Sequence, residues 1–312
     1  MHQTLGIEQL LALCKGAYSD NTLRGYAADL RNFQRWCRTE NLRWLPTLPE
    51  TVAGYVDHEA VSIAVSTLKR RIAAIKFAHR FSDLPSPVEA SCVQLALRRA
   101  SRRKVRRPAQ ARGLTADILA QIVDRNFATL SDVRNAAIIS VGYDTLCRSA
   151  ELAAIHVGHL CWSSDGSLSV LVPVSKGDPN GDGRVAWLSP TTAKILNRWL
   201  AEAEIETGPL FRSLHLARIS EHALDTCSIR RLVKRAAAKA GCDIETAKAL
   251  SGHSMRVGAA QDMLVSGFDS LAIMQAGGWK TPNVLLRYVE NAATQALHQR
   301  RWAASHPPLV NR

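Results

Sequence analysis

Four side chains near the C-terminus have the types and the order that phosphoryl transfer by a tyrosine would need. His253 and Arg256 stand three residues apart, and Trp279 and Tyr288 follow, so that all four fall within 36 residues. Residues three apart on a helix project from the same side, and Gly252 just before them permits close approach of the backbone to a ligand. An imidazole, a guanidinium, an indole N–H and a phenol together indicate a tyrosine nucleophile beside a phosphate-binding site.

Three residues earlier in the chain extend this pattern, although each alone is a weak signal. Arg148 and Glu151 could form a buried ion pair at a helix start, and Lys176 could be an ordinary turn lysine. Tyr288 has apolar neighbours and Trp279 is a large aromatic, so core packing is the usual role of each. Only the order and the spacing of the whole set favour a catalytic role.

These residue types also suit a reaction without a metal. Phosphoryl transfer depends mainly on positioning and on stabilising charge on the equatorial oxygens. The chain shows no carboxylate cluster suited to Mg²⁺, and none of its seven cysteines forms a CxxC pair with zinc spacing. Two arginines, a lysine and a histidine can supply the charge, so we expect neither a metal nor another cofactor.

The charge of the chain predicts a polyanionic partner. Formal net charge is +13, of which residues 1–112 carry +10, from 19 Lys/Arg and 9 Asp/Glu. A basic surface that neutralises phosphates releases counterions from nucleic acid. A soluble protein with a merely solvated basic surface is the alternative, and the uneven distribution of charge favours nucleic acid.

The first hundred residues read as a helical module without a strand pattern. Apolar residues recur at spacings of three and four over residues 19–38, where Ser19 offers a cap. Further helices are predicted over residues 49–59, 66–80 and 87–101. Lys69 and Arg70 lie mostly off the apolar face of the third helix, and we expect them to contact DNA.

A dense basic run follows this module. Residues 98–107 hold seven cations, which repel one another unless an anion lies between them. We interpret residues 102–113 as an interdomain linker that crosses a phosphate backbone and contacts it through Arg102, Arg103, Arg106 and Arg107. A solvated tail of the fourth helix is the alternative.

The remaining residues predict a mainly helical domain with one strand-rich insert. A new helix is predicted to start near Leu114–Asp117 with Thr115 as its cap, and another over residues 131–145. Residues 168–174 alternate as a strand should, and residues 184–188 return after a Gly/Asp-rich turn. A helix follows Pro190, and a basic helix over 225–240 suits a major groove or its flanking phosphates through Arg230, Arg231 and Lys234. An ordinary exposed basic helix is the alternative.

The complete pattern resembles the tyrosine recombinase (phage integrase) family. The resemblance rests on Arg148, Glu151, Lys176 in a turn, His253-x-x-Arg256, Trp279 and Tyr288. It also rests on the amino-acid sequence of residues 251–263 and 273–279. It implies a mainly α fold, in which a SAM-like core-binding domain of four or five helices (residues 1–107) precedes an α+β catalytic domain with a small antiparallel sheet (residues 108–312). A Cys at 147, where relatives usually carry a bulky aliphatic residue, departs from the family pattern.

The resemblance also implies a role for each residue. Arg148 and Arg256 would clamp the scissile phosphate, and arginine suits this as a planar, always-charged donor. His253 would act as general acid/base, and the Trp279 indole would donate to a phosphate oxygen. Glu151 would hold its neighbours in place and Lys176 would protonate the leaving 5′ oxygen. Tyr288 would attack phosphorus and form a 3′-phosphotyrosyl link.

The family further implies how such a protein works with DNA. The expectation is a site-specific recombinase that forms a homotetramer on two short inverted-repeat sites in double-stranded DNA and passes through a Holliday junction. The free protein would be a monomer or weakly associated. A C-terminal helix over residues 291–304 would dock on a neighbouring protomer, with folding back on its own domain as the alternative. Two rivals remain: a telomere resolvase or type IB topoisomerase, and a DNA-binding regulator without catalysis.

The rest of the composition predicts where the protein works. No apolar run approaches the roughly 18 residues of a membrane span, and residues 1–15 lack the features of a signal peptide. An odd, widely scattered set of cysteines argues against a disulfide framework. We therefore expect a bacterial or phage protein of the reducing cytoplasm, associated with the nucleoid and not with a membrane.

Overall fold

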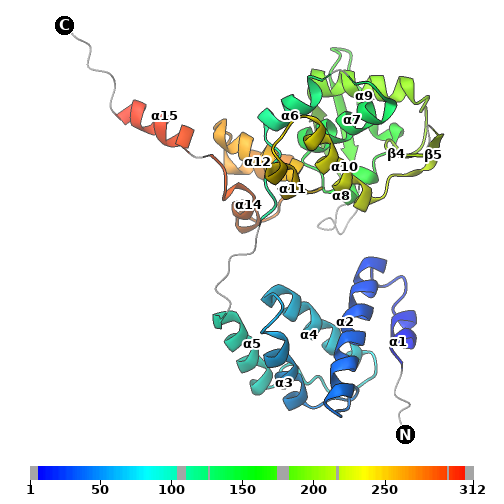
Figure 1. The fold of residues 1–312 in the computed structure, drawn as a ribbon, viewed down its shortest axis with the longest axis vertical. Helices are drawn as coiled ribbons and strands as arrows, with labels where there is room; N and C mark the ends of the chain where they lie inside the picture. The colour runs from blue at the N-terminus through cyan, green and yellow to red at the C-terminus, as the bar shows by residue number, and fades with distance from the viewer. Residues whose placement is uncertain are drawn as a thin grey trace. The chain divides into compact units, whose positions relative to one another are not determined.

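The computed structural model describes residues 6–103, 110–125, 127–173, 183–215, 218–293 and 295–305. The chain divides into two compact units, Met1–Pro108 and Ala109–Arg312 (Figure 1). Helices dominate both units, and the described strands form two small antiparallel sheets in the second, which confirms the predicted fold class. Within the described ranges, no helix is long and apolar enough to cross a membrane.

The first unit is built from helices alone in its described part. They are α1 (Ile7–Leu13), α2 (Asp20–Thr39), α3 (Pro49–Glu59), α4 (Val65–Arg80) and α5 (Ser91–Arg103). The short α1 was not predicted, because seven residues give too little periodicity to separate a helix from a loop. The fourth predicted helix begins later than expected, since residues 87–90 form a bend and turn, and Ser86 just before them donates to the Glu89 carboxylate.

The core of this unit follows from the predicted apolar spacing. Ser19 caps α2 by accepting from the Thr22 amide at 3.2 Å, and Leu30 and Phe33 of the same helix are fully buried. Phe33 packs edge-on against Tyr55 of α3, with ring centroids 4.9 Å apart. The apolar stripe of α2 therefore holds the bundle together.

The second unit begins and ends with helices and carries its strands in the middle. In chain order its elements are α6 (Ala116–Val123), α7 (Leu130–Asp144), α8 (Ser149–Ala153), a 3-10 turn (Val157–His159), β1 (Leu160–Trp162), β2 (Leu168–Val172), β3 (Arg184–Leu188), α9 (Pro190–Glu202), β4 (Arg212–His215), β5 (Arg218–Ala223), α10 (Thr226–Lys239), α11 (Ile244–Ala249), α12 (Ser254–Val265), α13 (Ser270–Gly277), α14 (Pro282–Val289) and α15 (Gln295–Ser305).

Helix α7 is the centre of this unit. Its residues Ala137, Ile138 and Ile139 are consecutive and fully buried, as expected for a helix that is covered on all sides. Helices α9, α10 and α12 pack around it. Trp199 of α9 is also fully buried, and its indole N–H donates to the Leu210 carbonyl at 2.9 Å.

The first sheet has the order β1-β2-β3 and is antiparallel throughout. In the β2–β3 hairpin Leu168 pairs with Leu188 and Val172 pairs with Arg184. Leu168, Val170 and Val172 are buried, so the alternation in the sequence correctly predicted which face of the strand is covered. Residue 174, which was included in the predicted strand, lies outside the described residues.

The second sheet, the β4–β5 hairpin, was not predicted. Its strands are paired antiparallel from Arg212 with Ala223 to His215 with Arg218. None of the strand residues is buried, so the sequence has no apolar–polar alternation to indicate a strand.

The segment that leads into the second unit is bonded to two C-terminal helices. The Leu114 amide donates to the Ser254 carbonyl of α12 at 2.8 Å, and a Cβ on Gly258 would lie 1.8 Å from the Leu114 carbonyl oxygen. Only glycine permits this contact. The Gln110 side-chain amide donates to the carbonyl of Tyr288 in α14 at 3.1 Å and its oxygen accepts from Asn291 at 2.9 Å.

Thr115 is the residue before α6, as predicted, but its side chain forms no capping hydrogen bond. Instead the Ala116 amide donates to the Asp262 carboxylate of α12 at 2.7 Å. A tertiary contact thus satisfies one of the unpaired amides of this helix start, which the local sequence could not indicate.

Candidate active site

The imidazole of His253 and the hydroxyl of Tyr288 are in direct contact. His253 Nε2 lies 2.7 Å from Tyr288 Oη, although the two residues come from different helices. His253 precedes the first turn of α12, whereas Tyr288 lies near the end of α14, where Leu285 and Val289 anchor the helix in the core. A neutral His253 can therefore accept the proton of this hydroxyl directly.

Arg256 lies behind this pair and is fully buried. Its guanidinium carbon is 4.1 Å from the ring centre of Trp279 and 5.4 Å from that of Tyr288. One of its nitrogens, Nη1, donates to the Leu146 carbonyl at 2.5 Å. Leu146 has a left-handed backbone (φ 51°), which is uncommon for a residue other than glycine and places that carbonyl at the site.

The other donors of this group are buried without partners. Arg256 Nε, Arg256 Nη2 and Trp279 Nε1 have no hydrogen-bond acceptor among the described residues. A buried unpaired donor costs roughly 1–3 kcal/mol, and more when it is charged. These donors belong to the Arg256 guanidinium and the Trp279 indole, beside the Tyr288 hydroxyl. An anion bound there would accept hydrogen bonds from them.

Arg256 remains a cation at neutral pH despite its burial. Burial first, and then the nearby charge of Arg148, lower the pKa of Arg256 to about 10. That value is still well above 7, so the guanidinium stays charged and keeps all its donors.

Arg148 and Glu151 form the next layer of the site. Glu151 is 4% exposed; it accepts from the Arg148 backbone amide at 3.0 Å and from the Arg148 guanidinium. Ser149, between them in the chain, donates to the Gly252 carbonyl at 3.1 Å. The start of α8 is therefore fixed to the residue before His253, and Glu151 orients Arg148.

Trp279 reaches the site through a tight turn. Gly278 ends α13 with a left-handed conformation (φ 66°), and the ring of Trp279 lies so close to Gly277 that a Cβ there would be 2.1 Å from it. The Trp279 and Tyr288 rings meet at 60°, with centroids 4.8 Å apart. Two glycines in sequence thus allow the indole to turn back onto the nucleophile candidate.

Comparison with known proteins decides the family. The model of the phage integrase family matches residues 112–295, and that of the phage integrase N-terminal SAM-like domain matches residues 9–82. The chain belongs to the phage integrase family. It is a site-specific tyrosine recombinase, as the residue pattern predicted.

Two relatives of this recombinase are similar over most of their length. Recombinase cre of Escherichia phage P1 is 30% identical over 295 residues, covering 88% of this chain and 85% of the relative. An integrase/recombinase xerD homolog of Selenomonas ruminantium is 30% identical over 285 residues, covering 87% and 82%.

Solved structures share the fold at lower identity. XerH bound to palindromic difH substrate, in a post-cleavage complex, aligns with a TM-score of 0.67 at 16% identity over 96% of this chain and 85% of that chain. A lambda integrase (75–356) dimer bound to a COC' core site aligns with a TM-score of 0.60 at 14% identity over 92% and 94%. At these identities the likeness supports the fold alone.

Six of the seven candidate catalytic residues of the recombinase lie in described segments. His253, Arg256, Trp279 and Tyr288 lie in contact with one another. Arg148, paired with Glu151, lies near enough for its charge to lower the pKa of His253 and of Arg256, although 140 positions separate it from Tyr288. Lys176 lies outside the described residues, and its role stays a prediction.

The candidate DNA-contacting residues are more scattered. Arg102 and Arg103 end α5 and are exposed, as are Lys69, Arg230 and Arg231. Two others already have internal partners: Arg70 pairs with Asp29 at 2.8 Å and Lys234 donates to the Lys248 carbonyl. Arg106 and Arg107 lie outside the described residues. Contact of all these candidate residues with DNA stays a prediction.

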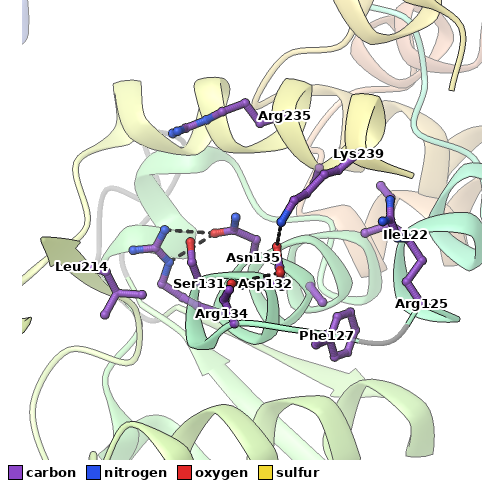
Figure 2. Close-up of a pocket in the computed structure, with 13 residues that line it drawn as sticks. Ile122, Arg125, Phe127, Ser131, Asp132, Arg134, Asn135, Leu214, Arg235 and Lys239 are labelled. Carbon is purple, nitrogen blue, oxygen red and sulfur yellow. Dashed lines mark hydrogen bonds and ion pairs between the residues drawn. The ribbon is translucent and has the colours of Figure 1, made fainter. Parts of the chain in front are cut away.

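Two other cations of the basic helix α10 are exposed but lie at the edge of a surface pocket. Figure 2 shows Arg235 and Lys239 at a cavity of about 320 Å³ that is also lined by residues of α7. Lys239 pairs with Asp132 at 2.6 Å, and Arg134 donates to Asn135 Oδ1 at 3.0 Å. The ion pair with Asp132 gives Lys239 a partner on α7, away from the candidate site.

The protonation of His253 gives a prediction for the pH dependence of cleavage. Burial, and then the charges of Arg256 and Arg148, hold the pKa of His253 below its usual value of about 6.5, against the opposite effect of Glu151. Because only the neutral ring can accept the Tyr288 proton, the single-turnover rate of cleavage should be nearly constant from pH 8 down to about 7 and fall roughly tenfold per pH unit only below the lowered pKa.

The measurement is single-turnover cleavage across pH 5 to 8 at constant ionic strength. His253→Gln cannot take up a proton in this range. Its cleavage rate should be much lower than that of the wild type and should no longer fall at low pH. A wild-type decline that already begins above pH 7 would contradict the proton-acceptor role.

Proposed function

We propose that this recombinase cleaves and rejoins double-stranded DNA through a 3′-phosphotyrosyl link to Tyr288. The observation that carries the proposal is the set of unpaired buried donors of Arg256 and Trp279 beside the His253–Tyr288 pair. A scissile phosphate placed there would accept from those donors while the Tyr288 hydroxyl faces the phosphorus.

The chemistry balances without an external reagent. Tyr288 Oη forms a bond to phosphorus as the bond from phosphorus to the 5′ oxygen breaks. The tyrosine proton passes to His253, and Lys176 protonates the leaving 5′ oxygen. Arg148 and Arg256 hold the phosphate. Because the link retains the energy of the phosphodiester bond, a 5′ hydroxyl can attack phosphorus, release Tyr288 and rejoin the strand without ATP.

Strand exchange would complete the reaction. We propose that four protomers assemble on two inverted-repeat sites, cut one strand of each, exchange them through a Holliday junction and repeat on the other strands. Support comes from the relatives: XerH was solved on a palindromic substrate and lambda integrase as a dimer on a core site. A protein acting on chromosomal or phage DNA would work at the nucleoid, in the cytoplasm.

The test uses DNA from either side of the native gene. The full-length protein is incubated with it in buffer containing EDTA and no ATP, and denaturing gels are scanned for a protein–DNA adduct. A covalent adduct whose released strand carries a free 5′ hydroxyl would support the proposal, and sequencing of the cut ends would locate the target. Specific binding without an adduct would favour a DNA-binding regulator.

The basic run gives a prediction about salt dependence. Replacing Arg102, Arg103, Arg106 and Arg107 with alanine should weaken DNA binding at all sequences, because phosphate contacts carry no sequence information. The slope of log K against log salt should flatten by up to about 3.6, at ~0.9 for each phosphate that the variant no longer neutralises.

A charge-matched control separates contact from overall charge. The double variant Arg102→Ala/Arg103→Ala is compared with Lys194→Ala/Arg198→Ala on α9, both titrated with DNA at four salt concentrations. Equal slopes for the two variants would mean that the basic run lies away from the phosphate backbone.

Helix α15 gives a prediction about assembly. Its Trp302 side chain is 56% exposed, which is unusual for so large an apolar group and leaves it available to a neighbouring protomer. Deleting the chain after Asn291 should leave binding of a single protomer to a half-site intact but reduce the formation of larger complexes on a full site, measured by native gel shift. Unchanged assembly and recombination would contradict docking and favour a helix that folds back on its own unit.

A further inference from the structure

One arginine outside the set named above links the segments that carry the candidate catalytic residues. Arg184, the first residue of β3, has a side chain that is 16% exposed. Its Nη1 donates to the Ala276 carbonyl at 2.8 Å and its Nη2 to the Thr145 carbonyl at 2.5 Å. The same Nη2 lies 3.7 Å from Cys147 Sγ and 4.0 Å from the Glu151 carboxylate.

Two of the segments that Arg184 contacts lead directly to phosphate-binding candidates. Thr145 and Cys147 immediately precede Arg148 in the chain, and Glu151 orients that arginine. Ala276 lies at the end of α13, three residues before Trp279. The guanidinium therefore ties the start of α8 to the turn that delivers the indole.

The third segment is the strand hairpin itself. Arg184 pairs with Val172 across β2 and β3, and the chain between these two residues carries Lys176. The last described pair of the β2–β3 hairpin is thus held at Arg184. A Cβ on Gly278 would lie 3.2 Å from Arg184 Cδ, so the turn before Trp279 also packs on the alkyl part of this side chain.

The contacts of Arg184 differ in kind from those of Arg256. Two of the Arg256 nitrogens are unpaired among the described residues, and its guanidinium lies against the Tyr288 ring. Arg184 instead directs its terminal nitrogens to main-chain carbonyls and to Glu151. Its geometry suits the orientation of other groups and not contact with the reacting atoms.

We propose that Arg184 is a positioning residue for strand cleavage, which holds the Arg148 segment, the Trp279 turn and the described end of the β2–β3 hairpin in one arrangement. The inference rests on the proposed function of these residues. Groups that orient ligating or catalytic residues change rates by about 10- to 100-fold when removed, because small misplacements weaken stabilisation of the transition state. DNA affinity, which depends on many phosphate contacts, should change little.

The test first establishes cleavage independently of Arg184. A DNA fragment is chosen on which the wild type forms the covalent adduct and Tyr288→Phe does not. On that fragment the maximal single-turnover rate and the half-saturating DNA concentration are measured for Arg184→Met, which keeps most of the apolar stem, and for Arg184→Lys, which keeps the charge but cannot bond both carbonyls in the same geometry.

Arg212→Met is the matched control. Arg212 also begins a strand, β4, and it also donates to main-chain carbonyls, those of Pro209 at 3.1 Å and of Thr207. These carbonyls lie outside the candidate site. Thermal unfolding of every variant shows whether the fold is retained.

We expect the maximal rate to fall about 10- to 100-fold in Arg184→Met and less in Arg184→Lys. The half-saturating DNA concentration should stay within about twofold, and Arg212→Met should cleave like the wild type. A wild-type maximal rate in either Arg184 variant that folds would overturn the inference, as would an equal loss in Arg212→Met or a loss confined to DNA affinity. Absence of an adduct with the wild type would instead refute the proposed cleavage, and the role of Arg184 with it.

Discussion

Replacing Tyr288 with phenylalanine is expected to abolish the covalent adduct and all recombination while leaving DNA binding unchanged. The substitution removes one oxygen, the atom that lies 2.7 Å from His253 Nε2. The ring contacts with Trp279 and with the Arg256 guanidinium do not need the hydroxyl, so the site should keep its shape. No other described tyrosine is in contact with His253 and Arg256, and we expect no residual cleavage.

Tyr143→Phe provides the matched control. Tyr143 is a half-buried tyrosine of the same unit that packs against the same apolar cluster, but its hydroxyl donates to the Asp262 carboxylate at 2.6 Å. Losing that hydroxyl should reduce the thermal midpoint and leave adduct formation in place. Adduct formed by Tyr288→Phe, mapped by proteolysis to another residue, would refute the assignment of the nucleophile.

Replacing Arg256 with methionine is expected to separate activity from stability. The cleavage rate should fall about 10³-fold or more, because loss of a single donor to a developing oxyanion already costs 10²- to 10³-fold. The folded protein, however, should lose little. A pKa lowered from its ordinary value to about 10 by burial and by Arg148 means that the charged guanidinium is disfavoured in the fold by about 3 kcal/mol.

Removing that charge relieves this cost but leaves the Leu146 carbonyl without its donor, at roughly 1–3 kcal/mol. The substitution also removes the cation–π interaction of the guanidinium with the Trp279 face, which is worth about 2 kcal/mol when buried. These contributions largely offset one another, so the free energy of unfolding should fall by no more than about 2 kcal/mol.

Urea unfolding and single-turnover cleavage measure the two effects. Ile138→Ala is the comparison for stability: it truncates a fully buried side chain of α7 and should cost about 2–5 kcal/mol without touching the site. If Arg256→Met destabilises as much as Ile138→Ala, the buried guanidinium is mainly a structural group, and the anion-binding interpretation of its free nitrogens fails.

Much of the fold could be predicted because its apolar pattern is local. The spacing of Leu30 and Phe33 in α2, and the alternation of Leu168, Val170 and Val172 in β2, are readable from short stretches of sequence and correspond to buried faces. The β4–β5 hairpin has no buried strand residue, so no such pattern exists, and α1 is too short for one.

The candidate site could be predicted for a different reason. His253, Arg256 and Tyr288 are chemically distinctive types in a recognisable order, and the structure places them together. The groups that hold them were not predictable. Arg184 is one of 40 Lys/Arg in the chain, and its carbonyl partners are 39 and 92 residues away. Every residue has a main-chain carbonyl, so the residue types at positions 145 and 276 do not indicate that they accept a hydrogen bond from Arg184.

The bonds of Gln110 bear on where the chain could be divided into two polypeptides. The boundary between the two units, after Pro108, comes just before the residues that bond to α14 and α12. A C-terminal fragment starting at Ala109 would retain the hydrogen bond from Gln110 to the Tyr288 carbonyl. A fragment starting at α6 would lack that bond to α14 and would also lose the contact of Leu114 with Gly258. If the recombinase is divided into two polypeptides that reassemble, residues 109–115 should therefore be kept on the C-terminal polypeptide, which carries Tyr288.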